Sequence, residues 1–180
     1  MQNHEIKNLV HVGMYCFVVS LVIGLVGSLF DAGSRHQVLL YSINDTLALA
    51  GCVLIGRYVG IRGQHIAASG FVMLGIVHGI SAGSSIEGGI NLESVRLVIP
   101  LIPSVLLIAW SKVFPNWLRI LGIISAIPFI ILYYSAWSQG LFNVEIATIS
   151  YVLLALVEIA WGILMVRDYH KTYLEEQSEA

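Results

Sequence analysis

Apolar residues fall into six long runs, separated by short polar or glycine-rich links. A helix needs roughly 20 mainly apolar residues to cross about 30 Å of hydrocarbon, and each run is close to that length. The first run is longer than the roughly 7–15-residue apolar segment of a signal peptide, so we expect it to be retained. The pattern therefore predicts six transmembrane helices, over Leu9–Phe30, Val38–Ile55, Ile66–Ala82, Ser94–Trp110, Trp117–Trp137 and Val144–Val166.

Basic residues in the links and near the ends of these runs are unevenly distributed between the two sides that six spans define. The side with both termini and the second and fourth links carries seven of them: Lys7, Arg57, Arg62, Lys112, Arg119, Arg167 and Lys171. The other side carries only Arg35 and Arg96. Because Lys and Arg accumulate on the cytoplasmic side of membrane proteins, we predict that residues 1–8 and the acidic tail 167–180 both lie in the cytoplasm, flanking a transmembrane domain over residues 9–166.

The composition agrees with residence in lipid. The chain of 180 residues is 57% hydrophobic and 11% charged, with a mean hydropathy of +0.83, whereas globular proteins are about 25% charged. We predict an all-α integral membrane protein whose main partner is the lipid bilayer. There is no basic patch, P-loop or dinucleotide fingerprint, so no nucleic-acid partner is expected. Cys16 and Cys52 lack metal-ligand spacing and are interpreted as small buried hydrophobic residues, so no metal site is predicted.

Small residues form narrow stripes on three of the predicted helices. In lipid, such residues let helix backbones approach closely. We expect five glycines to lie at helix contacts: Gly24, Gly27, Gly75, Gly79 and Gly162.

Three prolines lie inside the fourth and fifth predicted spans, at Pro100, Pro103 and Pro128. A proline cannot donate a backbone hydrogen bond, so it leaves the carbonyl four residues earlier free. For Pro100 and Pro103 those carbonyls belong to Arg96 and Ile99. We expect the fourth helix to be kinked, as membrane helices tolerate, or broken so that its free carbonyls line a polar cavity.

Ionisable residues within the spans are the strongest indication of function, because each costs roughly 2.5–3.5 kcal/mol to insert and tends to mark a functional site. With their polar neighbours they form the candidate binding or transport site: Asp45, His78, Arg96, Glu158, Asn44 and Glu93. Each ionisable residue also has a structural interpretation. Asp45 would cap a helix starting near Thr46, His78 or Glu158 would bond to a neighbouring helix, and Arg96 would reach the headgroups.

The functional interpretation is a polar vestibule that opens to the outside and narrows toward Glu158. In this arrangement Arg96 pairs with Asp45, and Asp45 and Glu158 differ in depth by roughly 8–10 Å at about 1.5 Å per residue. Glu158 would act as a proton-carrying carboxylate or as a cation ligand.

These features lead to a prediction of a permease or channel for a small solute or ion, with proton coupling through Glu158. In size and layout the chain is typical of small six-helix bacterial membrane proteins, so we expect it in the inner membrane, where a homo-oligomer would enlarge the pathway. One alternative is a non-catalytic subunit of a larger membrane complex. Another is a membrane-embedded enzyme or haem protein, in which His11 and His65, or His36 and His78, would hold the haem. No cofactor is predicted and no catalytic residue is assigned, since no HExxH motif is present.

Overall fold

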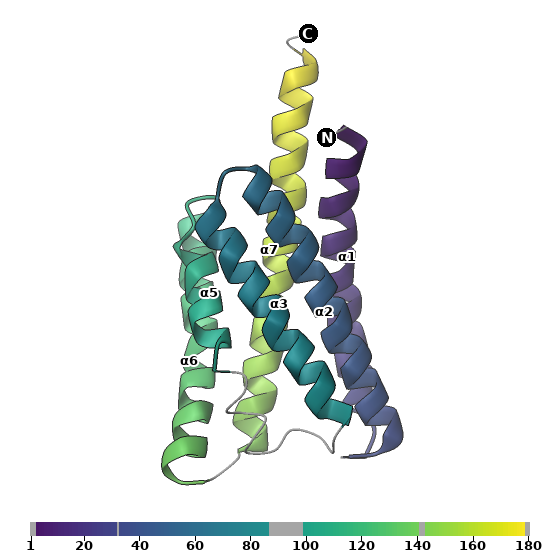
Figure 1. Cartoon of the computed structure of the whole chain (residues 1–180), viewed down its shortest axis with the longest axis vertical. Coiled ribbons are helices and arrows are strands. Elements are labelled where there is room, and N and C mark those ends of the chain that lie inside the picture. Colours follow the sequence, from purple (N-terminus) through teal and green to yellow (C-terminus); the bar gives the residue numbers. More distant parts are fainter. Residues whose placement is uncertain (1–2, 32, 87–98, 141–142, 179–180) are drawn as a thin grey trace.

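A computed structural model describes residues 3–31, 33–86, 99–140 and 143–178. All regular elements in these ranges are helices (Figure 1). They are α1 (Asn3–Gly27), α2 (Arg35–Ile61), α3 (His65–Ile86), α5 (Leu101–Trp110), α6 (Asn116–Ser138) and α7 (Val144–Ser178).

The all-helical prediction is confirmed for the described part of the chain. Five of these helices, namely α1, α2, α3, α6 and α7, are long and apolar enough to cross a membrane. The described helix α5 has only ten residues, or about 15 Å of length. The helices therefore support residence in a membrane, while the count of six spans and their orientation stay predictions.

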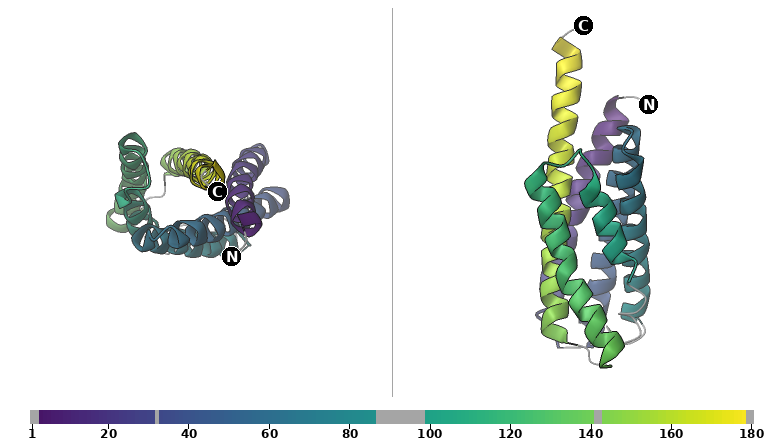
Figure 2. Two further views of the ribbon diagram at one scale, coloured as in Figure 1. Left: turned by 90° about the horizontal axis from the view of Figure 1, so that it is seen from above. Right: turned by 90° about the vertical axis from the view of Figure 1, so that its left-hand side faces the viewer.

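The helices form a ring that follows the order of the sequence. Each packs against the next along the chain, and α7 returns to pack against α1 and to touch α2 (Figure 2). Helix α1 begins and α7 ends at the same end of the bundle, where α7 extends beyond its neighbours (Figure 2). This arrangement brings α7 close to α1 and α2 although it is far from them in sequence.

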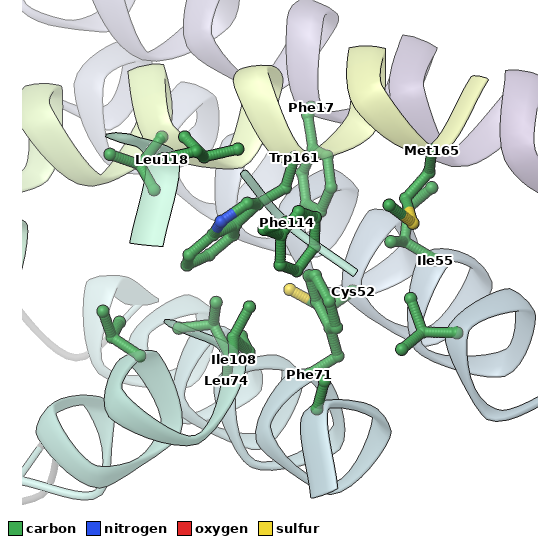
Figure 3. Packing of buried hydrophobic residues seen from close by; sticks show 14 of the residues in the cluster. Phe17, Cys52, Ile55, Phe71, Leu74, Ile108, Phe114, Leu118, Trp161 and Met165 are labelled. Atoms are coloured by element: carbon green, nitrogen blue, oxygen red, sulfur yellow. The ribbon is translucent and has the colours of Figure 1, made fainter. Parts of the chain in front are cut away.

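Large side chains fill the inside of the ring. Trp161, Phe71, Phe17 and Leu74 are among the fully buried residues of this core (Figure 3). The outer faces are apolar as well, and Val22, Ile120 and Ile163 are among their exposed side chains. Helices that are apolar on all sides are typical of a membrane, where lipid covers the outside of the bundle.

The three prolines lie at the start of α5 and inside α6. A turn at residues 99–100 precedes α5, Pro100 occupies its N-cap, and Pro103 lies in its first turn, where backbone N–H groups have no acceptor within the helix in any case. The prediction that the Ile99 carbonyl is free is wrong, because it accepts a hydrogen bond from the backbone N–H of Ile102 at 3.2 Å. The carbonyl of Arg96 lies outside the described residues. Pro128 lies inside α6, which continues past it.

The five glycines expected at helix contacts face neighbouring helices. An added Cβ at Gly162 of α7 would lie 3.2 Å from the Cα of Met14 on α1, and one at Gly27 would lie 2.9 Å from the ring of Tyr41 on α2. A methyl group would push these helices apart. The other three also have α2 atoms within 3.4 Å of an added Cβ: Gly24, Gly75 and Gly79.

Beyond Val166 the chain continues as helix to Ser178. Asp168 in this extension accepts a hydrogen bond from the hydroxyl of Tyr58 at 2.7 Å and pairs with Nε of Arg62 at 3.2 Å. These contacts attach the start of the acidic tail to the end of α2.

Candidate functional site

Three of the ionisable residues predicted from the sequence meet inside the bundle. Nδ1 of His78 on α3 lies 3.0 Å from Oδ1 of Asp45 on α2, and Nε2 of the same ring lies 2.9 Å from Oε1 of Glu158 on α7. Asp45 is 7% exposed, His78 5% and Glu158 2%. We call this carboxylate–imidazole–carboxylate arrangement the triad.

The position of Asp45 follows from where α2 begins. The side chain of Ser34 caps this helix by accepting a hydrogen bond from the backbone N–H of Gln37 at 3.3 Å, and the helix starts at Arg35. Asp45 therefore lies about three turns into α2. The alternative in which Asp45 caps a helix starting near Thr46 is wrong.

Asp45 and Glu158 contact the same imidazole ring, one at each nitrogen. Their predicted difference in depth stays a prediction, because the two carboxylates lie on opposite sides of that ring. The three side chains are also buried, so they form a closed centre and not the walls of an open vestibule.

When both carboxyls are ionised, the triad has an excess of negative charge. A buried ionised group is tolerated only when it is paired and hydrogen-bonded, and His78 supplies that pairing to both carboxylates. The imidazole carries at most one positive charge, whereas the two carboxylates carry up to two negative charges. The excess favours a bound cation, be it a proton or a metal ion.

Cys52 completes this centre, and sequence reasoning missed it. Its Sγ, a ring nitrogen of His78 and a carboxylate oxygen of Glu158 all lie within 4.8 Å of one another, and Cys52 is fully buried. The available signal was its spacing from Asp45. Seven residues at about 100° each return to nearly the same face of a helix.

Trp161 lies one helical turn beyond Glu158, in the core shown in Figure 3. Its ring packs edge-on against Phe71 at a centroid distance of 5.6 Å and contacts Phe114 at 6.0 Å. Its Nε1–H is buried and has no hydrogen-bond partner among the described residues. An unpaired buried donor costs about 1–3 kcal/mol, so this group is a further polar feature near the triad that helix packing does not explain.

Of the remaining predicted site residues, only Asn44 is described by the structure, and it does not join the triad. Asn44 faces α1, where its Oδ1 accepts a hydrogen bond from the hydroxyl of Ser20 at 2.9 Å. Arg96 and Glu93 lie outside the described residues, so the predicted pair between Arg96 and Asp45 stays a prediction.

The histidines considered as haem ligands have other neighbours. The ring of His36 stacks on Phe30 at 5.5 Å, and that of His11 packs edge-on against His170 at 5.5 Å. Both ring nitrogens of His78 face carboxylates. Iron ligation by His78 would require the loss of one of these two contacts.

Comparison with protein-family models, curated proteins and solved structures finds no match to this chain. Function is therefore inferred from the residues of the site. The triad and Cys52 offer carboxylate oxygens, an imidazole and a thiol, which are groups that bind cations and exchange protons.

Proposed function

We propose that this protein is a small permease or channel of a bacterial inner membrane that moves a small cation. In this proposal the chain has six spans and both termini lie in the cytoplasm, with α5 forming part of the fourth span. The triad is the cation-binding centre. The observation that carries the proposal is the convergence of Asp45 and Glu158 on the two nitrogens of His78.

The triad needs an explanation beyond stability. Well-packed apolar residues in place of a buried ion pair are often neutral or stabilising, and ionisable groups within membrane helices are associated with ion pathways and proton relays. Among the described residues, the other buried polar side chains are serines, so the two carboxylates and the imidazole of the triad stand out in a largely apolar interior. Cation binding accounts for their presence where helix packing does not.

Proton coupling follows from the same geometry. The contact of 2.9 Å between Nε2 of His78 and Oε1 of Glu158 is a hydrogen bond that holds one proton. A cation that coordinates the carboxylate of Glu158 takes the place of this proton. Movement of the cation in one direction is then linked to release of a proton at the same centre.

The test is cation flux in liposomes containing the purified protein, measured for monovalent and divalent ions with ion-sensitive dyes inside the vesicles. We expect Glu158→Gln and Asp45→Asn to reduce the flux of the transported cation at least tenfold. Glu145→Gln makes the same chemical change at an exposed position on α7, so this variant should transport like the wild type. Wild-type flux that does not exceed that of empty liposomes for any ion would refute the proposal, as would an unchanged flux in Glu158→Gln.

A further inference from the structure

We propose that Cys52, His78 and Glu158 form a binding site for a divalent transition-metal ion of the Zn²⁺ type. One ligand atom comes from each of α2, α3 and α7, and the three atoms lie within 4.8 Å of one another. All three residues are buried. The site therefore joins three helices at the centre of the ring.

The ligand atoms decide the class of ion. A thiolate and an imidazole together suit Zn²⁺ and its first-row neighbours, whereas Ca²⁺ and Mg²⁺ take oxygen ligands. Zn²⁺ binds sulfur at about 2.3 Å and nitrogen or oxygen at about 2.0–2.2 Å, which in a tetrahedron separates ligand atoms by roughly 3.3–3.7 Å. The distance of 2.9 Å between Nε2 of His78 and Oε1 of Glu158 would lengthen slightly when both atoms bind the ion. Ligand atoms that are up to 4.8 Å apart would have to move closer by about 1 Å to reach this geometry.

Asp45 supplies a second, independent indication of a metal site. A histidine that ligates a metal usually donates its other ring N–H to a carboxylate or carbonyl, which fixes the tautomer and the orientation of the ring. Oδ1 of Asp45 lies 3.0 Å from Nδ1 of His78, as this arrangement requires. With Nδ1–H donating to Asp45, the lone pair of Nε2 is directed toward the ion and Glu158.

Binding also leaves the net charge of the site unchanged. The thiol of Cys52 loses its proton, and the hydrogen bond between Nε2 of His78 and Oε1 of Glu158 loses the proton that it holds. Two protons leave as one divalent ion enters, so the buried site gains no net charge. Three protein ligands leave a fourth position open, which is typical of sites that are not purely structural.

The metal site is inferred from the positions of the side chains. The further idea that its ion is also the transported cation rests on the proposed function. The test of binding is a Co²⁺ titration of the purified, reduced wild-type protein in detergent. We expect one ion per chain, with the visible bands of tetrahedral cobalt and a near-ultraviolet thiolate-to-cobalt charge-transfer band. Cys52→Ser should abolish the charge-transfer band, whereas Cys16→Ser should keep it. Asp45→Asn should weaken binding roughly 10–100-fold, as loss of such a partner typically does.

A measurement on the wild type alone covers the case in which a variant fails to fold. X-ray absorption of the protein loaded with one equivalent of Zn²⁺ should show one sulfur at about 2.3 Å and lighter ligands at about 2.0–2.2 Å. Histidines such as His11 and His170 offer nitrogen only, so a shell without sulfur would overturn the site. Metal binding through the thiolate without cation flux would support the metal site and refute the proposed function. Cation flux without thiolate ligation would support the proposed function and refute the metal site.

Discussion

His78 separates two buried carboxylates. Its loss alone should lower the free energy of unfolding more than the loss of the whole triad. In His78→Leu, Asp45 and Glu158 remain buried without their shared partner. Breaking a buried ion pair in this way costs about 3–5 kcal/mol. That is a large part of the roughly 5–15 kcal/mol by which a protein is stable. The low exposure of both carboxylates, 7% and 2%, leaves little solvent to screen them.

Replacing all three residues with apolar ones of similar size removes the charges as well as their partner. Such replacements range from neutral to about 1–4 kcal/mol stabilising. The triple variant Asp45→Val, His78→Leu and Glu158→Met should therefore have a free energy of unfolding equal to or above that of the wild type. The free energy of unfolding of the single variant His78→Leu should be several kcal/mol lower than that of either protein. The triple variant should also fail to transport cations or to bind Co²⁺.

The assay is reversible unfolding of the purified protein in mixed micelles with increasing denaturing detergent, followed by circular dichroism. Leu154→Met, one turn before Glu158 in the same core, controls for repacking and should cost less than about 1.5 kcal/mol. A triple variant that is as unstable as His78→Leu would refute the reasoning. In that case the triad would contribute to stability in its own right, and its presence would no longer point to ligand binding.

Two further predictions concern the frame around the site. Gly70→Ala would place a Cβ 2.8 Å from the backbone oxygen of Ser104 on α5, so its melting temperature should fall, by an amount matching about 1–3 kcal/mol of overpacking. Gly83→Ala on the same helix meets nothing within 4 Å and should be neutral or gain up to about 1 kcal/mol of helix propensity. Tyr58→Phe removes the hydrogen bond of 2.7 Å to Asp168, which is worth about 1.5–3 kcal/mol with a charged acceptor, and amide exchange beyond residue 166 should become faster. Unchanged exchange there would show that this contact does not hold the end of α7.

Hydrophobicity located the long apolar helices but not their ends. The predicted second span stops at Ile55, whereas α2 runs to Ile61, and the predicted sixth span stops at Val166, whereas α7 runs to Ser178. The physical reason is that an apolar run ends where the hydrocarbon ends. A helix can continue into the polar interface, because its backbone hydrogen bonds do not depend on lipid.

The members of the triad could be found individually from the sequence, but their meeting could not. Each was singled out by its cost in lipid. Short links make sequential helices neighbours, which allows Asp45 and His78 to meet across α2 and α3. The approach of Glu158 depends on α7 closing the ring, and no pattern in the sequence specifies that contact.

One further step from the sequence would have found Cys52. An ionisable residue within a span avoids lipid, so it marks the inward face of its helix. Residues three, four or seven positions away then share that face. The large residues on these faces that are 0–1% exposed are Leu154, Trp161 and Met165 for Glu158, and Phe71 and Leu74 for His78. The same faces also carry half-buried residues such as Tyr151 and Ser81. Applied to Asp45, the same rule selects Cys52, which is also fully buried. Cys52 is a small buried residue of the hydrophobic core, as the sequence predicts, and its place on the face of a buried carboxylate is the signal that points to the proposed site.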